Sequence, residues 1–129
     1  MATWEDVRRI ALALPETDEW STGKCPRWRV QEKGFAWERP LRHADLKALG
    51  ADAPSGPILG ARVEHEGAKA ALLSEDPAVY FTTPHFDGYP AVLVCLDRIS
   101  VADLEDVIVD AWLARAPKRL AEPYISART

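Results

Sequence analysis

The stretch Pro90-Ala-Val-Leu-Val-Cys-Leu96 contains the longest uninterrupted apolar run of the chain, from Ala91 to Leu96. A strand that is apolar on both sides is typical of a sheet interior that is covered on both faces. The run is much shorter than the ~18 residues that a membrane-spanning helix requires. The sequence therefore predicts a central β-strand here and no membrane segment.

Two further strands are predicted before this run. Val79–Thr82 is separated from it by the loop Thr83–Tyr89, in which Asp87-Gly88 is a strong turn signal. Ile58–His65 alternates between apolar and polar residues, which indicates a strand with one buried face. A short helix over Gly67–Leu73 is expected to connect the two. The apolar side of Ile58–His65 carries Leu59, Ala61 and Val63, and the polar side carries Arg62 and Glu64.

A β-hairpin is predicted in the first third of the chain. Trp28 and Val30 alternate with other residues, and so do Phe35 and Trp37. A loop over residues 31–34 would pair Val30 with Phe35 and Trp28 with Trp37, which places all four large apolar groups on one face. The opposite face would then carry Arg27 and Arg29.

Helices are predicted at both ends of the chain. Thr3 is a good N-cap with Asp6 three residues later, and Ser100 has the same relation to Asp103. The last helix has a predicted buried stripe of Val101, Leu104, Ile108, Ala111 and Trp112, and an acidic outer stripe of Asp103, Asp106 and Asp110. We further expect a polar loop over Glu16–Gly23, a short helix over Ala44–Leu49 capped by Gly50, and a final short turn from Pro117 to Leu120.

The order of these elements indicates the fold class. Adjacent strands joined by short links and flanked by helices are typical of an antiparallel sheet with helical cover. We therefore predict an α+β two-layer sandwich, with an antiparallel sheet of about five strands and helices packed on one face. A length of 129 residues with 47% hydrophobic residues fits a single domain over residues 1–129.

The composition bears on the ligand class and the cellular compartment of the protein. The chain has 20 acidic and 16 basic residues, and the net charge of −4 disfavours a simple duplex-DNA binder. Two cysteines are too few for a disulfide framework, and the N-terminus does not resemble a signal peptide. We therefore expect a cytoplasmic protein, with Cys95 in the core and Cys25 in a loop.

Four segments together resemble the MmcQ/YjbR family. They are Ile10–Glu16 (IALALPE), Gly34–Trp37 (GFAW), Phe81–Val94 (FTTPHFDGYPAVLV) and Ala116–Leu120 (APKRL), of which Phe81–Val94 is the most specific. The resemblance covers essentially the whole chain. It implies a two-layer α+β fold similar to the frataxin-like and secretion-chaperone-like architectures, and DNA binding through protruding β-wings. It implies no family-wide catalytic residue and no cofactor.

Charge is unevenly distributed along the sequence. Residues 24–47 hold seven basic and three acidic residues, a net charge of +4, and the rest of the chain has a net charge of −8. With the resemblance, this segment predicts weak, salt-dependent DNA binding through the hairpin. The same cations are also typical of a solvated face that pairs with neighbouring carboxylates. The candidate nucleic-acid-binding residues are Arg27, Arg29, Lys33, Arg39 and Arg42, with Lys118 and Arg119, which would also stabilise a helix end.

The loop Thr83–Tyr89 is a second candidate site, because polar loops between strands often carry function. Its candidate residues are His85, Asp87 and Tyr89. His85 oriented by Asp87 would be a general base or a ligand-binding donor, or the segment would be a structural turn. The sequence otherwise lacks phosphate-loop, nucleophile-elbow and metalloprotease motifs. We expect no enzymatic activity, no cofactor and no bound metal.

Two functions remain open from the sequence. One is DNA binding through the basic hairpin, and the other is a non-enzymatic adaptor that binds a protein or small ligand through the acidic stripe or the His85 loop. Either would be a monomer or a weak homodimer. Trp20 fits no apolar stripe, and would cover the sheet edge or provide a stacking surface for a base or a protein partner.

Overall fold

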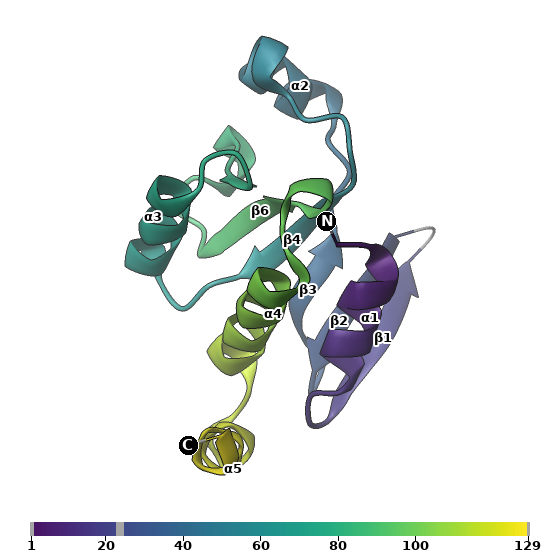
Figure 1. Cartoon of the computed structure of the whole chain (residues 1–129), viewed down its shortest axis with the longest axis vertical. Coiled ribbons are helices and arrows are strands. Elements are labelled where there is room, and N and C mark those ends of the chain that lie inside the picture. Colours follow the sequence, from purple (N-terminus) through teal and green to yellow (C-terminus); the bar gives the residue numbers. More distant parts are fainter. Residues whose placement is uncertain (1, 23–24, 129) are drawn as a thin grey trace.

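Six strands form one antiparallel sheet in the described residues, in the order β1-β2-β3-β4-β6-β5 (Figure 1). The computed structural model describes residues 2–22 and 25–128. The strands are β1 (Thr17–Thr22), β2 (Cys25–Val30), β3 (Lys33–Glu38), β4 (Ile58–Arg62), β5 (Tyr80–Phe81) and β6 (Ala91–Cys95). The helices are α1 (Trp4–Leu12), α2 (His43–Leu49), α3 (Glu66–Glu75), α4 (Val101–Arg115) and α5 (Lys118–Arg128), and the 3₁₀ turns are η1 (Gly50–Asp52), η2 (Pro84–Phe86) and η3 (Leu96–Arg98).

Strand β6 is the doubly covered strand that the sequence predicts. All five of its residues are buried, and it lies between β4 and β5. Val92 and Val94 pack into the main core beneath the helices. Leu93 and Cys95 belong to a smaller apolar cluster on the opposite side of the sheet. The prediction of an interior strand is confirmed.

The helical layer lies on one face of the sheet, which we call the inner face. Helices α1 and α4 pack against each other and against the strands there, as Figure 1 shows, with Leu104, Ile108 and Trp112 of α4 buried in the core. The opposite, outer face is covered at its β4–β6–β5 end by Phe86 and Leu41. The predicted two-layer α+β fold is confirmed, with six strands rather than about five.

The extra strand is β1, which occupies the segment predicted as a polar loop. Thr17–Thr22 pairs with β2 over its whole length, although it lacks a regular apolar alternation. The reason is that its inner side carries Glu19 rather than an apolar residue, and neighbouring polar groups hold that carboxylate. Gly23, the end of the predicted loop, lies outside the described residues, and Cys25 begins β2 rather than lying in a loop.

The predicted hairpin register is wrong, because the turn has two residues rather than four and β3 contains a β-bulge. The four large apolar groups therefore do not share one face. Val30 pairs with Lys33 and Trp28 pairs with Ala36, so that Phe35 is an extra residue in β3. The turn is only two residues long, because Gln31 and Glu32 both adopt a positive φ, as in a type I′ hairpin. The bulge lets Phe35 enter the inner core while Trp37 joins the outer cluster.

Local sequence signals locate the helix starts well. Thr3 and Asp6 form the predicted capping box, and the Ser100 hydroxyl accepts a hydrogen bond from the Asp103 N–H. Val101 is exposed, however, and is not part of the buried stripe. The predicted final turn is instead the start of α5, whose Tyr124 packs against Trp112.

Other boundaries shift by a few residues. The strand expected over Ile58–His65 ends at Arg62, and His65 caps α3 by accepting a hydrogen bond from Ala68. The helices expected over 44–49 and 67–73 and the strand over 79–82 are present as α2, α3 and β5. Within the described residues, no helix combines the length and apolar character needed to cross a membrane.

Glu19 joins the edge strand to the helical layer. Its Oε1 accepts hydrogen bonds from Arg8 Nε at 2.8 Å and from the indole nitrogen of Trp28 at 3.0 Å. Trp28 is almost fully buried and stacks on Trp4. The hydrogen bond from Arg8, followed by that from Trp28, holds the pKa of Glu19 below its ordinary value although desolvation opposes it.

We predict that Glu19→Ala lowers the free energy of unfolding by about 1–3 kcal/mol, because the Trp28 N–H loses its acceptor. Glu19→Gln keeps an acceptor oxygen and loses only the charge, so its loss should be smaller. Urea denaturation at neutral pH measures both. The stabilisation from the charge is present above the unfolded pKa of Glu and is lost as pH falls through the lowered folded pKa. Equal losses in the two variants would show that the Trp28 hydrogen bond contributes nothing.

Candidate functional site

The outer face of β1 and β2 carries an aromatic ring flanked by two cations. Trp20 lies opposite Arg27, and Arg29 follows two residues along β2 on the same side. Both guanidinium groups lie over the Trp20 ring, each 5.4 Å from its centre. Trp20 is 40% exposed. Contacts of this geometry are favourable cation–π interactions, so the three side chains form one group on the surface.

This group continues across the sheet to Trp37. Arg27 lies between Trp20 on β1 and Trp37 on β3 in the cross-strand register. Trp37 is partly buried and lies directly over Gly60 of β4, where a Cβ atom would come within 2.4 Å of the indole. The absence of a side chain at Gly60 therefore lets the ring lie flat on the sheet. We call Trp20, Arg27, Arg29 and Trp37 the outer-face row.

Asp18 partly neutralises the outer-face row. Its carboxylate accepts a hydrogen bond from Arg29 Nε at 2.7 Å, and this ion pair lies at the exposed surface. The hydrogen bond that Arg29 donates to Asp18 raises the pKa of Arg29 above its ordinary value, against desolvation. Arg27 makes no ion pair within residues 2–22 and 25–128, so it is the cation of the row that is available to an anion.

The seven predicted nucleic-acid-binding cations do not form one surface. Arg39 is buried and pairs with the buried Asp45 at 3.0 Å, so it anchors α2 and is closed to a ligand. Burial acts to raise the pKa of Asp45, but hydrogen bonds from the Arg42 N–H and from Arg39 hold it below its ordinary value. Arg42 itself is exposed at the start of α2.

The remaining cations lie toward the opposite end of β3 from Arg42. Lys33 is exposed at the β2–β3 turn. Glu16 accepts hydrogen bonds from Gln31 of that turn at 2.7 Å and from Arg119 of α5 at 3.2 Å. Arg119 thus reaches the turn already paired with a carboxylate. Lys118 is exposed beside it, and Lys24 of the positive segment lies outside the described residues.

The predicted His85 loop is a 3₁₀ turn with its three candidate side chains exposed. His85 packs edge-on against Phe86, and the described structure contains no hydrogen bond between His85 and Asp87. The Tyr89 hydroxyl accepts a hydrogen bond from Arg62 at 2.8 Å. The buried Lys69 anchors the loop, because its Nζ donates hydrogen bonds to the backbone carbonyls of Phe86 and Tyr89. The three residues therefore do not converge on one point.

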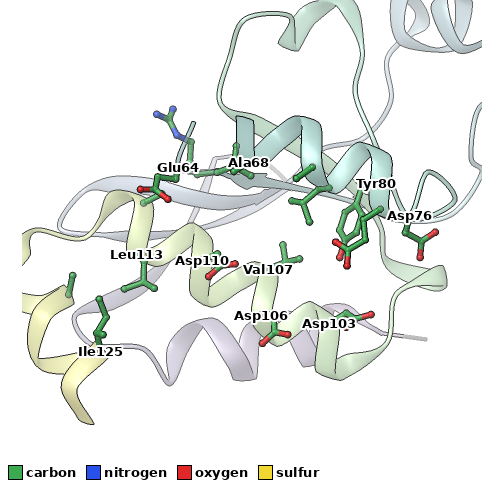
Figure 2. Close-up of a pocket in the computed structure, with 17 residues that line it drawn as sticks. Glu64, Ala68, Asp76, Tyr80, Asp103, Asp106, Val107, Asp110, Leu113 and Ile125 are labelled. Atoms are coloured by element: carbon green, nitrogen blue, oxygen red, sulfur yellow. The ribbon is translucent and has the colours of Figure 1, made fainter. Parts of the chain in front are cut away.

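The acidic stripe of α4 lines a cleft of about 850 Å³ between α3, α4 and α5 (Figure 2). Its apolar walls include Leu72, Val107 and Leu113. Its acidic residues are Glu64, Glu75, Asp76, Asp103, Asp106 and Asp110. Within the described part of the chain, no three His, Cys, Asp or Glu side chains are arranged to hold a metal ion.

Burial and negative charge shift two pKa values in this cleft. Burial, followed by the charges of Asp103, Glu75 and other carboxylates, raises the pKa of Tyr80 to about 12. Desolvation, with the charges of Asp106 and Glu64, raises the pKa of Asp110 above its ordinary value. Burial is thus the main cause of both shifts, and the neighbouring carboxylates add to it.

The chain matches a known protein family. The model of the YjbR family matches residues 12–114. The chain belongs to the YjbR family. Uncharacterized proteins of Mycobacterium tuberculosis and Mycobacterium bovis are 55% identical to it over 130 residues, covering 98% of this chain and 98% of each relative. The predicted family resemblance is confirmed.

A solved structure shares the fold of this YjbR protein. Deinococcus radiodurans protein DR2400, with the domain DUF419, has a TM-score of 0.63 and 19% sequence identity to it. The similarity covers 88% of this chain and 78% of that one. At this identity the similarity establishes the architecture of the domain.

Several contributing residues of this YjbR protein carry no distinctive sequence signal. Lys69 lies in a predicted helix where an exposed lysine is expected, yet it is buried. Gly60 resembles any small strand residue until Trp37 is placed over it. Tyr80 lies in a short strand, and only the packing of α3 and α4 brings it to the acidic stripe.

We predict that Gly60→Ala destabilises the protein by about 1–3 kcal/mol, because the new Cβ overlaps the Trp37 indole and forces it to move. Thermal denaturation would measure the loss, and a changed Trp emission spectrum would report the moved ring. Gly34→Ala is the matched control, since a Cβ there meets nothing within 4 Å. An unchanged melting temperature for Gly60→Ala would contradict the close contact.

Proposed function

We propose that this YjbR-family protein is a non-enzymatic DNA-binding protein that holds unpaired bases against its outer-face row. The supporting observation is the exposed Trp20 indole flanked by Arg27 and Arg29 on the sheet face opposite the helices. Nucleobases stack on aromatic rings, and arginines neutralise the adjacent phosphates. Trp20 and Trp37 lie two strands apart, roughly 10 Å, so two bases of an extended strand can each meet a ring.

The charge of the molecule favours unpaired DNA over the duplex. Stable duplex binding requires many phosphate contacts. Of the predicted cations, however, Arg39 is buried, and Arg29 and Arg119 are paired with carboxylates. The segments outside residues 24–47 carry a net charge of −8. Stacking, which does not require a large positive field, therefore supplies the main part of the expected affinity, and Arg27 and Lys33 add a weak salt-dependent part.

We predict that Trp20→Ala weakens binding to single-stranded DNA by about 1–3 kcal/mol, because one stacking surface is removed. Fluorescence anisotropy of a labelled oligothymidylate at low salt measures the affinity. Trp20→Phe retains an aromatic ring and should retain most of the binding. Equal affinity of Trp20→Ala and the unmodified protein would show that DNA does not stack on this ring.

We also predict that Arg27→Ala lowers the salt dependence of binding. The slope of log K against log salt should fall by about 0.7 if one phosphate contact of a single strand is lost. Arg9→Ala is the matched control, because Arg9 is an exposed arginine on α1, in the layer on the other side of the sheet. An equal change in both variants would indicate a general charge effect, and no salt-sensitive binding of any DNA would contradict the proposed function.

A further inference from the structure

The acidic cleft is a second site, distinct from the outer face of the sheet. It lies in the helical layer, with Asp103, Asp106 and Asp110 along α4 and with Tyr80 and Asp76 across from them (Figure 2). Its volume of about 850 Å³ is within the range of small-molecule sites. The walls combine carboxylates with apolar surface from Leu72, Val107 and Leu113, so the cleft suits a ligand that is both cationic and aliphatic.

Tyr80 is a largely buried residue that presents an unpaired hydroxyl to the cleft. Its side chain points from β5 into the cleft toward α4 (Figure 2), and the residue is only 6% exposed. Its hydroxyl makes no hydrogen bond with any other residue that the structure describes. The hydroxyl oxygen is not one of the fully buried side-chain atoms that lack a partner, so it is accessible from the open space of the cleft. A bound ammonium group would donate to this oxygen.

The carboxylates of the cleft have no cationic partner in the described parts of the chain. None of the six belongs to an ion pair there, although several other carboxylates on the surface do. Arg62, at one end of the cleft, is engaged instead with the Tyr89 hydroxyl and ring. The cleft therefore carries an uncompensated negative charge that a cationic ligand would neutralise.

The arrangement of the acids favours an extended cation over a metal ion. No group of three metal-ligating side chains converges in the described structure. Along α4, Asp103, Asp106 and Asp110 are separated by about 4.5 and 6 Å of helix axis. Nitrogens joined by spacers of three or four methylene groups are similarly spaced, and the spacers would lie on the apolar walls.

We propose that this cleft binds a linear aliphatic polyamine. Its ammonium groups bind Asp103, Asp106 and Asp110 and donate to the Tyr80 hydroxyl, and its methylene chain packs on Val107 and Leu113. The proposal does not depend on DNA binding, because it uses no residue of the outer-face row.

Isothermal titration of the full chain with spermidine at physiological salt tests the proposal. We expect saturable binding at one site, and at least a tenfold weaker affinity for the double variant Asp106→Asn with Asp110→Asn. The control, Glu105→Gln with Glu122→Gln, removes the same charge from the same two-helix region outside the cleft lining, and should change the affinity less than twofold. Equal weakening in both double variants would overturn the proposal in favour of general charge attraction.

Tyr80→Phe separates a built site from simple charge attraction. It leaves every charge in place and removes only the hydroxyl, so we expect about a tenfold loss of affinity. Magnesium chloride at equal ionic strength should not displace spermidine. An unchanged affinity of Tyr80→Phe, complete displacement by magnesium, or the absence of saturable binding would each overturn the proposal. Binding of oligolysine without binding of spermidine would also overturn it and would indicate a basic peptide instead.

Discussion

A strand with apolar side chains on both sides has to be covered on both faces, and β6 imposes this requirement on the rest of the molecule. On the inner face the cover is the helical layer, in which Leu104 and Ile108 of α4 are part of the core. On the outer face it is a small cluster that includes Phe86 and Trp37. Because β6 lies toward the β5 end of the sheet, the outer cover is needed at that end.

The two candidate sites lie on different sides of the sheet. At the β1–β2 end, the outer face carries Trp20 with two arginines rather than an apolar cluster. In the helical layer, α3 and α5 flank α4 and leave a cleft whose walls are acidic. The net charge of −4 thus includes a positive group on one surface and a negative cleft on another. A single total charge describes neither surface.

Membership of the YjbR family establishes the architecture and leaves the ligand to the surfaces of this chain. The mycobacterial relatives are 55% identical over nearly their whole length, so they offer a test of whether the outer-face row and the cleft occur together. In this chain the two surfaces use different chemistry, aromatic stacking on one and carboxylate pairing on the other. They can therefore be examined independently.

The sequence by itself determined the features that depend on neighbouring residues. Helix caps at Thr3 and Ser100 form within one turn, and the apolar run around Leu93 has to be buried wherever it lies. The tertiary structure decided the features that depend on distant partners. β1 pairs with β2, and Glu19 joins it to Arg8 and Trp28. The hairpin register was decided by a bulge that sends two aromatic residues to opposite faces, and hydrophobic alternation alone does not encode it.

The candidate sites, too, were visible in the sequence only in part. The sequence located the basic hairpin and the acidic stripe, because charge is visible in composition. It did not reveal that Arg39 is buried against Asp45 or that Lys69 supports a loop, since any arginine or lysine is first expected at the surface. Nor did it place Tyr80 opposite α4. Burial and pairing arise from contacts between segments far apart in the chain, and these contacts exist only once the two layers have packed.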